Sequence, residues 1–354
     1  MPQTLAVTGF FNRSASPKYA IPLERAKIVE RSGKTLWDNS NRLEMWGWTG
    51  SASEDTMKKM AEQAVGLDVI SPTWFVLENK EGKFEDTSSK EMVDWFHERG
   101  LEVHPLVQNQ FDSSLTTAFL ANANGQDQFI QSLVDRAASI GADGLNIDFE
   151  SVNAKDRAAF TEFMRKLTSK AHAKKLEVSI DLMRGSISWN HLTAFDHEQL
   201  AKIVDTVIIM AYDQHWSGST EAGSVSGLQW TEQGIQEFLS YGMSREQLIL
   251  GMPFYIREWK LDSSGKVLEN RALYTSAVSK LLSENEYTAV WDPEFNQYKI
   301  QYMKDGYTYV FWLEDQRTLE ARLELAKEYR LGGAAAWRLG QEPASFWETI
   351  ISNK

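Results

Sequence analysis

Short runs of apolar residues alternate along the chain with stretches whose apolar positions recur at helical spacing. A period of two predicts a strand, and a period near 3.6 predicts a helix. Eight β-then-α units in series favour a (β/α)8 barrel over an open doubly wound sheet. The expected barrel strands are Leu43–Trp48, Asp68–Phe75, Glu102–Gln108, 143–149, Glu177–Met183, Thr206–Tyr212, Leu248–Phe254 and Gly333–Trp337.

One connection interrupts this rhythm. Residues 257–316 stand between the seventh strand and the last long helix, which is expected at Leu319–Tyr329. Within this connection, Gln297–Met303 and Tyr307–Trp312 alternate aromatic and polar residues around Lys304-Asp305-Gly306, which predicts a β-hairpin. A small inserted α+β subdomain is therefore expected between the seventh and eighth strands, and a long decorated loop is the alternative.

The predicted fold class is α/β, a (β/α)8 TIM barrel with this small α+β insertion. The barrel is assigned to 41–256 and 317–354, and the inserted subdomain to 257–316. Residues 1–40 form an N-terminal extension rich in turn formers and charges, to which the sequence gives no role. We expect a monomer.

Composition narrows the classes of function. The 354 residues are 42% hydrophobic, which suits one barrel-sized domain with an insertion. The net charge of −12 argues against nucleic acid as a partner, because that binding needs a basic surface. There is no Cys, so neither disulfides nor thiolate chemistry is available. Aromatic residues make up 12%, which fits either sugar-stacking platforms or core packing.

Several other signals are missing from the sequence. No apolar run reaches the 18 residues or so that a membrane span needs. The first residues have no basic segment, and their apolar stretch is short and interrupted, which makes a poor signal peptide. The six His show no metal-binding spacing, and no Gly-x-Gly-x-x-Gly motif occurs, so we expect neither a metal nor a cofactor.

The most informative stretch is Asp-Gly-Leu-Asn-Ile-Asp-Phe-Glu at 143–150. In a strand, alternate side chains share a face, so Asn146, Asp148 and Glu150 would point one way and the apolar residues would face the helices. Two acids at the end of a barrel strand suit glycosidic hydrolysis, where one carboxyl donates a proton and another stabilises developing positive charge. A merely solvated acidic strand end is the alternative.

This octapeptide resembles the signature of glycoside hydrolase family 18, the chitinase-like hydrolases. Ala142 stands where that family usually has a larger apolar residue, and Asn146 replaces the Asp of the chitinase version. Met210-Ala-Tyr-Asp213 is similar to the motif on the family's sixth strand, and Trp337 to the tryptophan of its eighth. Three further runs resemble the branch of spore cortex-fragment-lytic N-acetylglucosaminidases, namely Gly251–Tyr255, Phe311–Asp315 and Ala336–Gly340.

The resemblance implies a substrate-assisted retaining mechanism, which departs from the two-carboxylate scheme. Glu150 would be the general acid and then the base, while Asp148 would hold the N–H of the substrate's 2-acetamido group. Tyr212 would bind the acetamido carbonyl, and Trp337 would stack beneath the sugar ring. Asn146 cannot share a proton with Asp148 as a carboxyl can, so we expect Asp148 to titrate differently here. Asp143, out of phase with the other acids, is expected to bind backbone N–H groups.

Other residues at the strand ends are weaker candidates for substrate binding. Asp213 could bind a sugar hydroxyl or orient Tyr212, and His215 could touch sugar or simply lie on the surface. We also expect contributions from Asn146, Met210, Tyr255, Gln108 and Asn109. For Gln108 and Asn109 a loop-capping role is the alternative. Among Trp46, Trp48 and Trp74, two are expected to be core residues.

The resemblance thus predicts an N-acetylglucosaminidase that cleaves β-1,4 bonds in GlcNAc-containing glycans. Peptidoglycan or spore cortex fragments are the favoured substrate, and chitin or its oligosaccharides are the alternative. A non-catalytic, chitinase-like glycan-binding protein is the second hypothesis, and a structural protein of the spore or envelope the third. A wall, spore or extracellular location is favoured from the resemblance, although no LysM wall-binding repeat occurs in the sequence.

Overall fold

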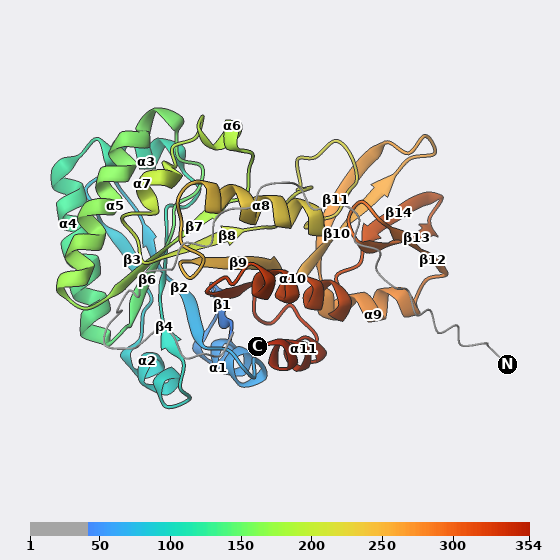
Figure 1. The fold of residues 1–354 in the computed structure, drawn as a ribbon, viewed down its shortest axis with the longest axis horizontal. Coiled ribbons are helices and arrows are strands. Elements are labelled where there is room, and N and C mark those ends of the chain that lie inside the picture. Colours follow the sequence, from blue (N-terminus) through green and yellow to red (C-terminus); the bar gives the residue numbers. More distant parts are fainter. Residues whose placement is uncertain (1–41) are drawn as a thin grey trace. The chain divides into compact units, whose positions relative to one another are not determined.

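The computed structural model describes residues 42–354, so the extension expected at 1–40 lies outside the described residues. Parallel strands close into a barrel, in which each strand pairs with the next and β1 pairs with both β2 and β15 (Figure 1). This confirms the predicted TIM barrel. Its strands are β1 (Glu44–Gly50), β2 (Val69–Leu77), β4 (Glu102–Val103) with β5 (Leu106–Gln108), β6 (Gly144–Asp148), β7 (Glu177–Met183), β8 (Thr206–Met210), β9 (Leu248–Pro253) and β15 (Gly333–Trp337).

The third barrel strand departs from the prediction of one continuous run. It is divided into β4 and β5, both of which pair with β2. Pro105 lies between them, and a proline has no N–H to donate to a strand ladder. A short antiparallel strand, β3 (Phe84–Asp86), extends the sheet beyond β2.

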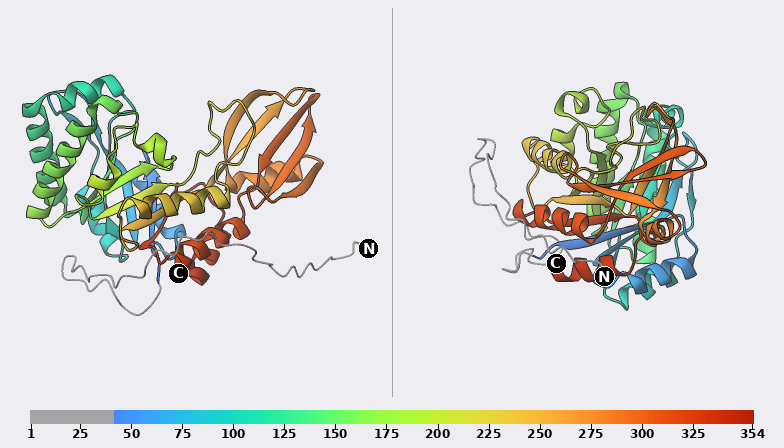
Figure 2. Two further views of the ribbon diagram at one scale, coloured as in Figure 1. Left: turned by 45° about the horizontal axis from the view of Figure 1, so that its top comes forward. Right: turned by 90° about the vertical axis from the view of Figure 1, so that its right-hand side faces the viewer.

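Helices surround the barrel, as Figures 1 and 2 show. The helix α4 illustrates how the sequence sets their ends. Its N-cap Asn122 accepts the N–H of Gly125, and Gly141 adopts the left-handed conformation (φ 81°) that ends it just before β6. The helices are α1 (Glu54–Gln63), α2 (Lys90–His97), α3 (Ser113–Leu120), α4 (Ala123–Ile140), α5 (Arg157–Ala173), α6 (Ile187–Asn190), α7 (His197–Leu200), α8 (Leu228–Ser240), α10 (Gln316–Glu328) and α11 (Ser345–Asn353), with a 3-10 turn at Ala154–Asp156.

A second sheet follows β9 and precedes α10, so the predicted insertion between the seventh and eighth barrel strands is present (Figure 2). The predicted hairpin is formed by β13 and β14, with Asp305 and Gly306 at φ 52° and 79° in its two-residue turn. The exact domain boundaries stay a prediction. The insertion consists of β10 (Tyr255–Leu261), β11 (Val267–Tyr274), α9 (Thr275–Ser283), β12 (Tyr287–Asp292), β13 (Gln297–Lys304) and β14 (Tyr307–Trp312).

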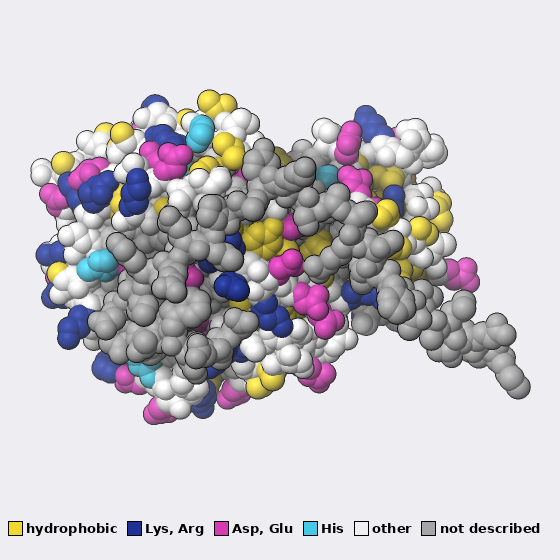
Figure 3. Space-filling view, viewed as in Figure 1, with side chains coloured by type: hydrophobic (Ala, Val, Ile, Leu, Met, Phe, Trp, Pro, Cys, Tyr) yellow, Lys and Arg dark blue, Asp and Glu magenta, His cyan; other side chains and the backbone are white. Residues whose placement is uncertain are grey.

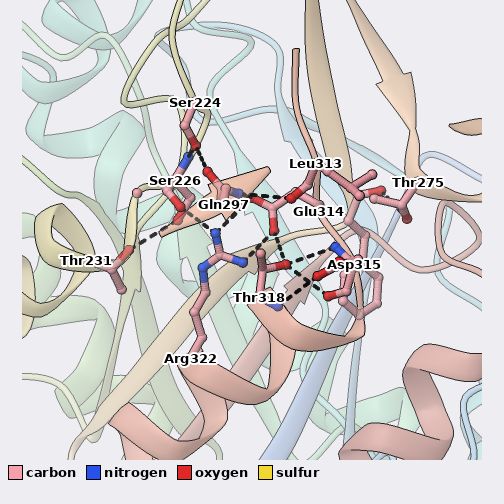
Figure 4. A network of polar contacts seen from close by, with 12 residues as sticks. Ser224, Ser226, Thr231, Thr275, Gln297, Leu313, Glu314, Asp315, Thr318 and Arg322 are labelled. Atoms are coloured by element: carbon pink, nitrogen blue, oxygen red, sulfur yellow. Dashed lines mark hydrogen bonds and ion pairs between the residues drawn. The ribbon is translucent and has the colours of Figure 1, made fainter. Parts of the chain in front are cut away.

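A buried polar network joins the barrel to the inserted sheet (Figure 4). Arg322 on α10 pairs with Glu314 at 2.5 and 2.8 Å, and their side chains are only 3% and 2% exposed. Glu314 also accepts a hydrogen bond from Gln297 at the start of β13. Gln297 in turn accepts one from Ser224, and Arg322 donates to the backbone carbonyl of Ser226, both in the loop after β8. One ion pair thus connects a barrel helix, a barrel loop and the inserted sheet.

Among the described residues, no helix has the length and apolar character needed to cross a membrane. On the face shown in Figure 3, basic and acidic side chains of this part of the chain are interspersed.

Candidate active site at the carboxyl ends of the barrel strands

The strands sort their side chains between two sides of the barrel wall. On β6, Leu145 and Ile147 pack outward with the helices, and Phe149 follows them into a cluster with Phe129 and Phe163. Asn146, from the alternate set, hydrogen-bonds across the barrel interior to other strands. A smaller apolar cluster fills the interior, and it includes Trp46, Trp48, Ile208 and Ile249. The apolar alternation of β6 therefore turns its polar row inward.

Glu150 lies two residues beyond the end of β6 and is half-buried. No strand ladder holds it there. Instead, the Asn109 side chain accepts the backbone N–H of Glu150 at 2.9 Å and donates to its carbonyl at 2.7 Å. Asn109 also donates to Thr116. The structure thus shows the loop-capping alternative for Asn109, which fixes the backbone that carries Glu150.

The electrostatic setting of Glu150 suits a proton donor. Burial, followed by the negative charges of Asp148 and Asp213, raises the pKa of Glu150 to about 8. Burial and the neighbouring Asp181 carboxyl raise the pKa of Asp148 well above its usual range. Glu150 is therefore mainly protonated at neutral pH, as a general acid requires.

The amide of Asn146 is buried and makes four hydrogen bonds. Its oxygen accepts the indole N–H of Trp48 at 2.8 Å and the hydroxyl of Ser71 at 3.2 Å. Its nitrogen donates to Ser179 at 2.9 Å and to Asp181 at 2.8 Å. Because an indole N–H can only donate, the amide oxygen must face Trp48 and the nitrogen must face Asp181.

Aromatic rings from four strands or their ends gather beside these acids. The ring of Tyr212, just after β8, lies nearly parallel to that of Trp337 with centroids 6.5 Å apart. Trp337 also meets Trp48 edge-on at 5.6 Å, and Tyr212 meets Tyr255 edge-on at 6.4 Å. Burial first, and then the charges of Asp181 and Asp148, raise the pKa of Tyr212, so its hydroxyl keeps its proton. The arrangement offers flat rings and a neutral hydroxyl next to a protonated acid, which suits a sugar ring.

Asp213 links the barrel to the inserted sheet. Its backbone adopts a left-handed conformation (φ 57°), and its carboxylate accepts the hydroxyl of Tyr255 at 2.6 Å. Arg257 on β10 stands 4.0 Å from the same carboxylate. Asp213 thus holds Tyr255 in place, and its charge also acts on Glu150.

The remaining candidates are Met210, Gln108 and His215. Met210 is buried at the end of β8, and Gln108 pairs in register with Asp148. His215 points its Nδ1 to the carbonyl of Ser224 at 2.9 Å and packs edge-on against Phe295, so it is engaged on the side of the inserted sheet. Contact of any of these residues, or of the buried Asn146 and Asn109, with a substrate stays a prediction.

Several features outside the acid row have structural roles. Asp143 accepts the backbone N–H of Val103 at 2.8 Å, which confirms the backbone-binding role expected for it. Trp46, Trp48 and Trp74 are all buried, one more than expected, and Trp48 also serves the site through Asn146. Within residues 42–354, no group of three or more His, Asp or Glu is arranged to hold a metal ion.

Two further residues near the site, Asp181 and Arg257, can be placed at the strand ends from the sequence, but the sequence patterns assign them no role. Both stand near strand ends, and Asp181 follows the inward parity of Ser179 on β7. The alternation of β7 points Asp181 toward the barrel interior. Because burying a carboxylate without a partner is costly, a carboxylate at such a position indicates a functional role.

Comparison with known proteins identifies the family to which the chain belongs. The sequence profile of glycosyl hydrolases family 18 matches residues 47–342. The uncharacterized glycosylase YvbX of Bacillus subtilis is 24% identical over 301 residues, which cover 80% of this chain and 84% of that protein. The cortical fragment-lytic enzyme of Bacillus cereus is 25% identical over 264 residues, which cover 72% of this chain but only 59% of that enzyme. The putative sporulation-specific glycosylase YdhD of Bacillus subtilis is likewise matched over only 56% of its length.

Solved structures show the same fold. A chitinase from Chromobacterium violaceum superposes with a TM-score of 0.79 at 20% identity, over 88% of this chain and 98% of that one. The Bacillus cereus spore cortex-lytic enzyme SleL gives a TM-score of 0.78 at 22% identity, over 88% of this chain and 74% of that one. With the profile match across most of the barrel, these findings establish that the chain belongs to glycosyl hydrolases family 18.

Proposed function

We propose that this chain hydrolyses β-1,4 bonds in GlcNAc-containing glycans by substrate-assisted retaining catalysis. The observation that carries the proposal is the half-buried Glu150 beside the buried Asp148, a setting that raises the pKa of Glu150. Peptidoglycan or spore cortex fragments are the favoured substrate, because cortical fragment-lytic enzymes are among its relatives. Chitin oligomers are the alternative, since endochitinases are similar as well.

In this mechanism each residue has one task. Glu150 gives its proton to the glycosidic oxygen as the bond to the anomeric carbon breaks, while the substrate's own acetamido oxygen attacks that carbon. Asp148 accepts the acetamido N–H, and the Tyr212 hydroxyl donates to the acetamido oxygen. Trp337 stacks beneath the sugar ring. The Glu150 carboxylate then takes a proton from the water that opens the cyclic intermediate, which restores the acid.

Product analysis tests the function. Purified peptidoglycan and chitin oligomers are incubated separately with the protein, and the products are identified by mass spectrometry. We expect new reducing-end GlcNAc, released first as the β-anomer because the mechanism retains configuration. The glycan that is cleaved faster identifies the substrate class. Binding to either glycan without any product would instead favour a non-catalytic glycan-binding protein.

The pH dependence follows from the raised pKa of Glu150. The acid must be protonated in the free enzyme, so kcat/KM should fall as pH rises through about 8, by about tenfold per unit beyond it. An ordinary Glu would lose its proton near pH 4.5 and leave little activity at pH 7. The measurement is kcat/KM between pH 5 and 10, with folding checked by circular dichroism at each pH.

Asp213→Asn provides a comparison for this profile. It removes one of the negative charges that raise the pKa of Glu150, so the basic limb should move to lower pH. Only part of the shift should disappear, because burial is its largest cause. A wild-type limb near pH 5 would contradict the assignment of Glu150 as the acid.

A further inference from the structure

A third carboxyl, Asp181, lies inside the barrel next to the proposed acids and has no part in the mechanism above. It is 3% exposed and belongs to the inward set of β7 with Ser179. The register pairs Asn146 with Ser179 and Ile147 with Ile180, so Asp148 and Asp181 come level on neighbouring strands. Neighbouring strands are about 4.8 Å apart, which puts the two inward carboxyls side by side.

The two carboxyls are not equivalent, because only Asp181 has a hydrogen-bond donor fixed on it. Its Oδ1 accepts the Asn146 amide at 2.8 Å, and the orientation of that amide is fixed by the Trp48 indole. Oδ1 of Asp148, in contrast, is buried and has no hydrogen-bond partner in the described part of the chain. Hydrogen bonds to a carboxylate favour its charged form, so a single negative charge shared by this pair resides on Asp181.

The groups that face Asp181 make a second charge costly. Asp148 and Glu150 come from β6 and its end, and Tyr212 from the end of β8, while Trp48 from β1 and Asn146 are neutral. Burial raises the pKa of both Asp181 and Asp148. Two adjacent buried carboxyls therefore resist carrying two negative charges at once, and they titrate as a pair.

We propose that Asp181 is a positioning residue that holds the site's negative charge before substrate binds and takes the proton of Asp148 when Asp148 accepts the acetamido N–H. One proton leaves a carboxyl oxygen of Asp148 and joins a carboxylate oxygen of Asp181, so the total charge does not change. Asp148 thereby becomes an anion without losing a proton to solvent. Asn146 cannot perform this step because all its hydrogen-bonding positions are occupied and an amide does not take up the proton. The inference rests on the proposed function and adds a residue to its mechanism.

The test first removes the carboxyl of Asp181 from β7 and then, in a second variant, places a carboxyl at position 146 on β6. In Asp181→Asn, the new amide oxygen can still accept from Asn146, but no group is left to take the proton. Asp148 must then ionise by itself in a buried place. We expect the acid limb of kcat/KM to move up by about one pH unit or more, which lowers activity at pH 6 about tenfold or more. KM in the pH-independent range should change less than kcat.

The double variant Asn146→Asp with Asp181→Asn has the same composition as the wild type, with the carboxyl and the amide exchanged. The indole of Trp48 and the hydroxyl of Ser71 would then face a carboxylate. We expect the acid limb to return toward its wild-type position and kcat to recover. Circular dichroism and thermal melting check the fold of each variant. If Asp181→Asn alone does not fold, the acid limb and kcat of the exchanged variant are compared with those of the wild type instead.

The outcomes separate this inference from the proposed function. If wild type gives no product from any GlcNAc-containing glycan, the proposed function fails. If wild type is active and Asp181→Asn keeps its pH profile, or the exchanged variant stays as impaired as the folded single variant, the role of Asp181 fails while the function stands.

Discussion

Replacing Glu150 by Gln should lower kcat for a natural GlcNAc oligosaccharide by about 10²–10⁴-fold, which is the usual contribution of a positioned general acid. The amide has nearly the same shape as the acid but cannot transfer a proton to the departing oxygen. Fold and stability should hardly change, because the raised pKa means that the wild-type side chain is already mainly neutral at pH 7. The measurement is kcat by product release, with thermal melting of both proteins.

Two comparisons sharpen this test. Glu320→Gln makes the same chemical change at an exposed position of α10 and should leave kcat unchanged. An aryl glycoside whose leaving group departs without protonation should lose less of its first-step rate in Glu150→Gln than the natural oligosaccharide does. Wild-type turnover of the natural substrate by Glu150→Gln would remove Glu150 from the mechanism.

The largest effect on stability is expected at the joint between the barrel and the inserted sheet. Arg322→Met removes one partner of a fully buried ion pair and leaves the Glu314 carboxylate without its cation. It also frees the carbonyl of Ser226. An unpaired buried charge of this kind costs about 3–5 kcal/mol, so the free energy of unfolding should fall by that amount. Denaturant unfolding followed by fluorescence measures it.

Lys90→Met is the matched control, because it also replaces a paired cation by methionine. Lys90 bonds both oxygens of Asp94 at 2.7 and 2.8 Å, but both side chains are more than half exposed. An exposed i,i+4 pair contributes only about 0.3–0.5 kcal/mol. Adding Glu314→Leu to Arg322→Met should recover much of the loss, since the uncompensated charge is then gone. Equal losses from Arg322→Met and Lys90→Met would contradict a buried, structurally important pair.

The barrel could be predicted from the sequence because its signals are local. Alternation within each strand, helical spacing between strands and the turn at Asp305-Gly306 each depend on neighbouring residues only. The division of the third strand at Pro105 is also a local effect, so it could have been predicted from the proline in the sequence. The acid row on β6 and the ring of Trp337 were named from motifs, and the structure brings them into one neighbourhood.

The remaining features depend on contacts between distant segments. That Asp181 comes level with Asp148 follows from the register between β6 and β7, which no single strand pattern contains. Asn109 binds the backbone of a residue 41 positions away, and Ser224 meets Gln297 across 73 positions. Side-chain chemistry alone left Asn109 with two possible roles, and the loop-capping hydrogen bonds became visible only in the three-dimensional arrangement.

The network around Arg322 also has a consequence for protein engineering. The inserted sheet begins right after β9 and ends just before α10, so an exchange of this sheet between relatives needs only two junctions. A chimera that brings in a foreign sheet must still present an amide at the position of Gln297 to the Glu314–Arg322 pair of the host. Recombination points placed between Phe254 and Tyr255 and after Trp312 keep that pair on the host side. The donor sheet must then also supply the groups that bind the host barrel, such as the hydroxyl of Tyr255 for Asp213 and the indole of Trp259 for the carbonyl of Gly223.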